Sequence, residues 1–362
     1  MGLGAIVLII LPNSYAGVVI SRSFFGLGFG ASYITFIIYA SEISSPKVRA
    51  HLIFLLHLFL TFGMLLFTVF CLGSNLSFAF RVTGSLTVAL VVISTAIGIF
   101  TMKSSHIFMI QNNSKDALER FQFFQQDSTE NPHVESETMQ SYIIEEKKRR
   151  YDFLGRHNAT AMVVVVLVKL GYVSIFNALH NFYRTVLLSA FLTIGDTNYT
   201  PMIMMGTRLC GCIAGFFLLD YITKRLQYFI PAVIVSVLLF IFGILMVIYQ
   251  SLYIWTPMLF FVPLEFSLGV GLSPIADILK GELFPLKEKP VSIATTIVFE
   301  EVIHIICIIL LYSWIFSLGS VPRTLTFIFG AITLVFGFGV LTLLRDSRKQ
   351  SLRIVANLYS DK

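Results

Sequence analysis

Residues 51–72 read HLIFLLHLFLTFGMLLFTVFCL, a run that contains no Asp, Glu, Lys or Arg. About 20 apolar helical residues are enough to cross the hydrocarbon core of a bilayer, which is roughly 30 Å thick. Nine other stretches of the 362-residue chain are similarly apolar and about as long. The ten stretches are residues 2–20, 22–41, 51–72, 79–101, 161–194, 201–220, 228–250, 255–280, 291–316 and 324–344. The sequence therefore predicts an all-α membrane protein with about ten transmembrane helices.

The overall composition supports this prediction. The chain is 56% hydrophobic and 13% charged, whereas soluble domains are usually about one quarter charged. The apolar runs are continuous rather than alternating, which favours helices over the strands of a membrane barrel. The first stretch is the weakest of the ten, because Pro12, Asn13 and Ser14 interrupt it.

One charged insert divides the spans into four and six. We therefore expect an N-terminal transmembrane bundle at 1–102, a cytoplasmic linker with short helices at 103–157, a C-terminal transmembrane bundle at 158–344 and a cytoplasmic tail at 345–362. Within the linker, Ser114 is placed to cap a helix over 115–121, and residues 137–153 are a second helical candidate.

Basic residues set the orientation of a membrane protein, because Lys and Arg are enriched in cytoplasmic loops. If both termini are cytoplasmic, most of the 26 basic residues lie in inner loops, the insert and the tail. Lys280 is counted among these inner-loop residues. Those on the outer side are Arg22, Arg81 and Arg323, and those inside spans are Lys169, Arg184 and Arg208. We predict cytoplasmic termini and a multi-pass location, with the plasma membrane as the expected membrane.

Two Asn-X-Ser/Thr sequons lie in outer loops under this orientation. They begin at Asn75 and Asn198, which are the candidate glycosylation sites. Enzyme motifs such as H-E-x-x-H, G-x-S-x-G and the Walker sequence do not occur, so we expect no enzyme activity.

Several charged and glycine-containing segments follow one another in a fixed order. Residues 21–30 read SRSFFGLGFG, and residues 39–50 read YASEISSPKVRA. Later segments are DYITKR at 220–225, ELFPLKEK at 282–289 and RDSRKQSL at 345–352. Together they resemble the sugar porter family of the major facilitator superfamily, with its G-R-x-x-x-G, Y-x-x-E-I-x-P-x-x-x-R-G, D-x-x-G-R-R, E-x-F-P-x-x-x-R-G and P-E-T-K-G-x-S-L motifs. Within that family, the insect trehalose and sugar transporters are the most similar branch.

The resemblance implies a fold of two six-helix bundles and transport of a sugar or related small solute by alternating access, either facilitative or proton-coupled. In the family alignment this chain starts at the third span, so we expect its first bundle to be incomplete. A non-transporting solute sensor, or a degenerate member without transport activity, is the alternative. The expected partners are the solute, the lipid bilayer and, in the coupled case, protons. No cofactor, metal or nucleic acid is expected.

In family members, charged residues at the inner ends of the spans form a network in one state and lose it in another. The corresponding residues here are Glu42, Arg49, Asp220, Lys224, Arg225, Glu282 and Lys289. The predicted gating network also includes Arg22, although this residue lies on the outer side. Exposed ion pairs are worth about 0–1 kcal/mol each, so several must act together to bias a two-state equilibrium. The alternative interpretation is anchoring of the inner loops without a gating role.

The family's sugar-contacting positions are mostly neutral, whereas this chain has ionisable residues there. His57 and Arg208 replace a Gln and an Asn, Asp277 replaces a Trp, and Glu300 and Glu301 replace an Asn-Trp pair. The seventh-span motif is not recognisable, and Asn177 lies in that region. The predicted substrate-binding residues are therefore His57, Asn177, Arg208, Asp277, Glu300 and Glu301.

Ionisable side chains inside a membrane cost about 2.5–3.5 kcal/mol on insertion scales, so they usually face water or a partner. Three interpretations stay open: a charged or amphiphilic substrate, an ordinary sugar with tolerated changes, or internal ion pairs in a protein that no longer transports. Arg208 with Asp277 or Glu300 is the expected example of such a pair. Proton coupling through His57, Glu300 or His304 is a further hypothesis.

Overall fold

The computed structural model describes residues 1–45, 48–71, 76–101, 144, 153, 155, 158–172, 200–248, 255–285, 287–318 and 323–345. The regular elements in these ranges are helices, as predicted. Eight of the helices within these ranges are long and apolar enough to cross a membrane, and Asn158–Tyr172 is a shorter apolar helix. The predicted span 161–194 is described only as far as Tyr172. Nearly all of the linker and tail lies outside the described residues, including both predicted linker helices.

The chain forms two compact units. The first consists of Met1–Ser45 and Gly63–Lys147, and the second of Pro46–Phe62 and Lys148–Lys362. Helix α3 (Arg49–Cys71) therefore contributes its first part to the second unit. The four predicted regions and their boundaries stay a prediction, and the two units are described separately below.

In the first unit, the short helix α1 (Gly2–Ile10) packs against both α2 (Tyr15–Ile43) and α4 (Leu76–Thr101). The Ser21 hydroxyl donates a hydrogen bond to the Gly4 carbonyl oxygen at 2.7 Å. A Cβ on Gly4 would lie 2.7 Å from the Ser21 carbonyl oxygen. Glycine is therefore what allows α1 and α2 to approach so closely.

The predicted span 2–20 is wrong in its bounds. Helix α1 ends at Ile10, and residues 15–20 belong to the same continuous helix as the predicted span 22–41. Pro12 explains the break, because a proline disfavours the helical conformation of the residue before it. The Ser14 side chain then caps α2 by accepting a hydrogen bond from the Gly17 N–H at 3.3 Å.

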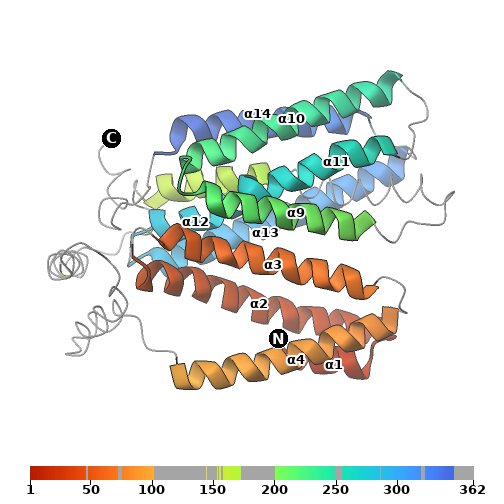
Figure 1. Ribbon diagram of the computed structural model, residues 1–362, viewed down its shortest axis with the longest axis vertical. Coiled ribbons are helices and arrows are strands. Elements are labelled where there is room, and N and C mark those ends of the chain that lie inside the picture. Colours follow the sequence, from red (N-terminus) through yellow and green to blue (C-terminus); the bar gives the residue numbers. More distant parts are fainter. Residues whose placement is uncertain are drawn as a thin grey trace. The chain divides into compact units, whose positions relative to one another are not determined.

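The second unit contains most of the remaining helices, which run roughly along one another (Figure 1). They are α9 (Thr200–Leu218), α10 (Lys224–Ile248), α11 (Trp255–Ser267), α12 (Pro274–Leu283), α13 (Lys289–Leu318) and α14 (Arg323–Leu343). Helix α10 packs along α14, and α9 packs along α11. A Cβ on Gly211 of α9 would collide with the backbone of Phe266, so the α9–α11 contact depends on glycine.

Helices α11 and α12 form one discontinuous apolar span. A π-helical turn, Leu268–Leu272, separates them, and Pro274 opens α12 as a new helix. In the best apolar window of Leu259–Leu283, 72% of residues are buried, against at most 44% in the other candidate spans. The Gln227 side-chain amide of α10 donates to the Val270 carbonyl oxygen at 3.0 Å. Wide turns of this kind are frequent at functional sites, and this one brings a helix N-terminus into a buried region.

Candidate transport site

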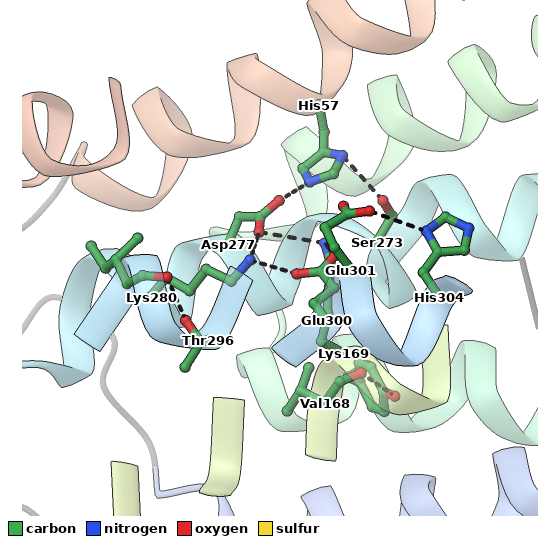
Figure 2. A network of polar contacts seen from close by, with 12 residues as sticks. His57, Val168, Lys169, Ser273, Asp277, Lys280, Thr296, Glu300, Glu301 and His304 are labelled. Atoms are coloured by element: carbon green, nitrogen blue, oxygen red, sulfur yellow. Dashed lines mark hydrogen bonds and ion pairs between the residues drawn. The ribbon is translucent and has the colours of Figure 1, made fainter. Parts of the chain in front are cut away.

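The first turn of α12 places Asp277 against His57 of α3 (Figure 2). His57 Nε2 contacts Asp277 Oδ2, and His57 Nδ1 lies 3.1 Å from the Ser273 hydroxyl oxygen. Asp277 is fully buried, and His57 is 7% exposed. A carboxylate in the first turn of a helix is stabilised by the backbone N–H groups there, which offsets part of the cost of burying Asp277.

Two lysines approach the other oxygen of the same carboxylate. Lys169 Nζ lies 3.5 Å and Lys280 Nζ 3.0 Å from Asp277 Oδ1. Both lysines also reach Glu300 of α13, at 3.0 Å and 2.9 Å respectively. Lys169, Lys280, Asp277 and Glu300 thus form a closed arrangement, here named the charge ring, in which each lysine contacts both carboxylates (Figure 2). The two lysines and the two carboxylates of the ring carry charges that sum to zero.

A second buried ion pair joins α9 to α11. Arg208 directs both Nε and Nη2 at Glu265 Oε2, each at 2.7 Å. Arg208 is 2% exposed and Glu265 is fully buried. Near the charge ring, the Lys169 ammonium lies 4.9 Å from the centre of the Tyr172 ring, a distance typical of a cation–π contact.

The structure brings together three of the predicted substrate-binding residues: His57, Asp277 and Glu300. The ion pair formed by Arg208 is with Glu265, rather than with Asp277 or Glu300 as expected. The side chain of Glu301 is 62% exposed and lies 3.7 Å from His304 on its own helix, so it is not part of the ring. Asn177 lies outside the described residues.

The sequence interpretation missed Glu265 and misjudged Lys280. Lys280 is not an inner-loop charge, because it is fully buried in α12 and paired with Asp277 and Glu300. Its spacing of three residues from Asp277 was an available signal, since such residues share one face of a helix. Glu265 stands inside an apolar span, where a charge requires a partner, but Arg208 was expected to pair with Asp277 or Glu300 instead.

Several predicted gating residues of the second unit gather at the adjoining ends of its helices. Lys224 Nζ at the start of α10 lies 2.7 Å and 2.5 Å from the two carboxylate oxygens of Glu282 in α12. Lys289 at the start of α13 is fully buried and donates to the Gly281 carbonyl oxygen at 2.9 Å. Asp220, just after α9, is half exposed and lies 3.4 Å from His51 Nε2.

The other predicted residues are less closely grouped or lie elsewhere. Arg49 is buried at the start of α3, whereas Arg225 is exposed. Arg22 is exposed and Glu42 half-buried, and both belong to the first unit. A gating role for these residues stays a prediction. The candidate glycosylation sites Asn75 and Asn198 lie outside the described residues.

Known proteins resemble this chain along almost its whole length. The family described as "Sugar (and other) transporter" matches residues 2–359. The "Facilitated trehalose transporter Tret1" of Apis mellifera ligustica is 19% identical over 367 residues, which cover 97% of this chain and 70% of that protein.

Solved structures of XylE share the fold. A double Trp mutant of XylE has a TM-score of 0.82 and 13% identity, covering 99% of this chain and 82% of that one. The proton:xylose symporter XylE bound to 6-bromo-6-deoxy-D-glucose has a TM-score of 0.81, with the same identity and coverage. This likeness confirms the predicted all-α major facilitator fold, and the family match confirms the predicted resemblance. The chain therefore belongs to the sugar (and other) transporter family, and it is a multi-pass membrane transporter rather than an enzyme.

Proposed function

We propose that this chain carries a neutral sugar, or a related polyhydroxylated solute, across the membrane by alternating access. The observation that supports a neutral solute is the charge balance of the buried centre. The charge ring sums to zero, and Arg208 is offset by Glu265. A charged solute would leave an uncompensated charge in a region of low dielectric constant, which is strongly unfavourable.

A neutral polyol fits the same groups without this penalty. Its hydroxyls exchange hydrogen bonds with lysine, carboxylate and hydroxyl groups while the net charge stays constant. The relatives point in the same direction, since Tret1 is named for trehalose and XylE for xylose. Trehalose and xylose are therefore the first solutes to try.

Counterflow in proteoliposomes tests this proposal. Vesicles loaded with unlabelled xylose or trehalose are diluted into labelled solute, and transient uptake of label is measured. We expect uptake that excess neutral sugar abolishes and that glucuronate and glucosamine leave intact. Exchange of the two charged analogues in preference to neutral sugars would contradict the proposal, as would a lack of exchange with a broad panel of neutral sugars.

The buried network also favours one alternative, a solute sensor that does not transport. Within the second unit, the charge ring and His57 connect α3, the helix Asn158–Tyr172, α12 and α13. Breaking buried ion pairs costs several kcal/mol, roughly 3–5 per pair when one partner is left alone. Because these ion pairs are costly to break, the network could keep the protein in a single conformation that binds solute without transporting it. Saturable sugar binding by the purified protein without any counterflow would favour the sensor.

We further propose that the ends of the second unit that carry Arg49, Lys224 and Lys289 face the cytoplasm, together with both chain termini. These basic residues stand at the starts of α3, α10 and α13, and cytoplasmic ends of membrane helices are enriched in Lys and Arg. We expect the plasma membrane as the location. Epitope tags at either terminus should be stained at the cell surface only after permeabilisation, and staining of intact cells would contradict this orientation.

A further inference from the structure

His57 brings an imidazole, which can both donate and accept a hydrogen bond, into contact with the charge ring. An imidazole ordinarily titrates between about pH 5 and 8, which is not true of a lysine, arginine or carboxylate of ordinary behaviour. His57 also bridges two elements, since Nε2 contacts Asp277 of α12 and Nδ1 contacts Ser273 just before that helix. Figure 2 shows the imidazole lying between these two side chains.

The described elements around the buried centre of the second unit carry further charged and titratable groups besides His57. They are Lys169 and Tyr172 on the helix Asn158–Tyr172, Arg208 and Cys212 on α9, Glu265 on α11, Asp277 and Lys280 on α12, and Glu300 on α13. Among them, three cations face three carboxylates. The charges of these six ions cancel, so a proton added to His57 would give the buried centre one positive charge.

We propose that His57 is a proton-binding site of the transport cycle, so that solute movement is linked to proton movement. This inference rests on the proposed transport function. In the neutral state, His57 Nε2–H donates to Asp277, and Nδ1 accepts a hydrogen bond from the Ser273 hydroxyl. When a hydronium ion gives a proton to Nδ1, one O–H bond of hydronium breaks, one N–H bond forms and a water molecule is left. The new N–H donates to the Ser273 oxygen, the hydroxyl hydrogen turns to another acceptor, and the charge of the site rises by one.

The added charge changes the contact between α3 and α12. Asp277 then faces three cations, His57, Lys169 and Lys280, while the ring still holds only two carboxylates. Repulsion among the cations weakens the lysine contacts, whereas the His57–Asp277 contact becomes an ion pair. A state of the transport cycle in which these lysine contacts are broken would therefore bind the proton with a different affinity from the state described here, which is the condition for coupling.

The other described histidines of this unit lack these features. His304 lies 3.7 Å from Glu301, an exposed residue of the same helix that is not part of the charge ring. His51 faces the half-exposed Asp220, where solvent screens the interaction. His304→Gln is therefore a matched control for His57→Gln.

Glutamine is a suitable replacement at position 57, because its amide can donate to Asp277 and accept from Ser273 but does not titrate. It is also the residue that sugar porters carry at the corresponding position by the alignment above. The test measures labelled sugar in proteoliposomes with an acidic exterior. A gradient of about one pH unit supports up to about tenfold accumulation if one proton accompanies each solute.

We expect the wild type and His304→Gln to accumulate sugar when the gradient is imposed. His57→Gln should still exchange sugar in counterflow, more slowly, but should no longer accumulate it. Gradient-independent uptake by the wild type, or accumulation by His57→Gln, would overturn the inference while leaving transport intact. Loss of counterflow in the wild type would instead contradict the proposed function.

A second experiment measures proton binding by His57 without any transport. Infrared difference spectra of the purified protein between mildly acidic and neutral pH should contain a histidine ring band that is missing in His57→Gln and present in His304→Gln. If the wild-type and His57→Gln spectra coincide, His57 takes up no proton in this range and the inference fails.

Discussion

The charge ring and the Arg208–Glu265 pair bury the same kinds of groups in two different arrangements. In the ring, Lys169 and Lys280 each divide their contacts between two carboxylates. In the pair, Arg208 directs two nitrogen atoms at one oxygen of Glu265. A shared arrangement can lose or move one member while each lysine keeps a counter-charge. The ring is thus suited to a site that changes during transport, and the pair to holding α9 against α11.

The comparison predicts the largest loss of stability at the pair. Glu265→Gln removes the charge that faces both Arg208 nitrogens and leaves a buried guanidinium with a neutral amide. We expect the free energy of unfolding to fall by about 3–5 kcal/mol, measured by denaturant titration of the purified protein in detergent. Replacing both residues, Arg208→Met with Glu265→Leu, should recover most of this loss because no buried charge remains. A single variant as stable as the wild type would show that the pair does not anchor the helices.

A smaller loss is expected when the most connected member of the ring is changed. Asp277→Asn removes the carboxylate that contacts His57, Lys169 and Lys280, but both lysines keep Glu300. The free energy of unfolding should fall by about 2–4 kcal/mol, and sugar exchange should be abolished. If Asp277→Asn is less stable than Glu265→Gln, the shared ion pairs of the ring do not reduce the cost of losing one carboxylate, and the proposed difference between the ring and the pair is wrong.

Two adjacent glutamates on α13 provide a sharper contrast. Glu300→Gln weakens one side of the ring while both lysines keep Asp277, so we expect a loss of about 1–3 kcal/mol together with slower counterflow. Glu301→Gln alters an exposed residue outside the ring and should change stability by less than about 0.5 kcal/mol. Equal effects of the two substitutions on unfolding and exchange would contradict the assignment of Glu300 to the site.

The helices of this molecule were largely predictable because membrane thickness fixes their length. The predicted spans 79–101 and 324–344, for example, correspond closely to α4 and α14. The first span failed because a local effect, the break at Pro12, overrode hydropathy. In the candidate site, residue type identified His57, Asp277 and Glu300 as unusual. Their mutual contact was not predictable, since His57 and Asp277 are 220 residues apart in the chain and meet only through tertiary packing.

The sequence identified many of the unusual charged residues, but it did not predict which of them form ion pairs with one another. Lys280 was read from its place near the end of a span, where basic residues usually mark the cytoplasmic side. Its burial and its contact with Glu300 of α13 arise from tertiary packing, which no local sequence pattern reports. Glu265 was overlooked because it stands alone among apolar residues. A buried carboxylate requires a cation, but this rule alone does not identify Arg208, and only the structure shows that pair.

The smallest effect is expected at the solvent-exposed contact between Asp220 and His51. Asp220 is half exposed and faces His51 at 3.4 Å, so Asp220→Asn should change the free energy of unfolding by no more than about 0.5 kcal/mol. If the same substitution also changes the free-energy difference between the inward and outward states by about 0.5 kcal/mol, the ratio of the two states changes by about twofold. Counterflow rates at steady state can detect a change of this size. Anchoring without gating predicts no change in exchange at all. A tenfold change would mean that Asp220 controls the transition by itself, and the gating prediction, in which several weak pairs act together, would then be wrong.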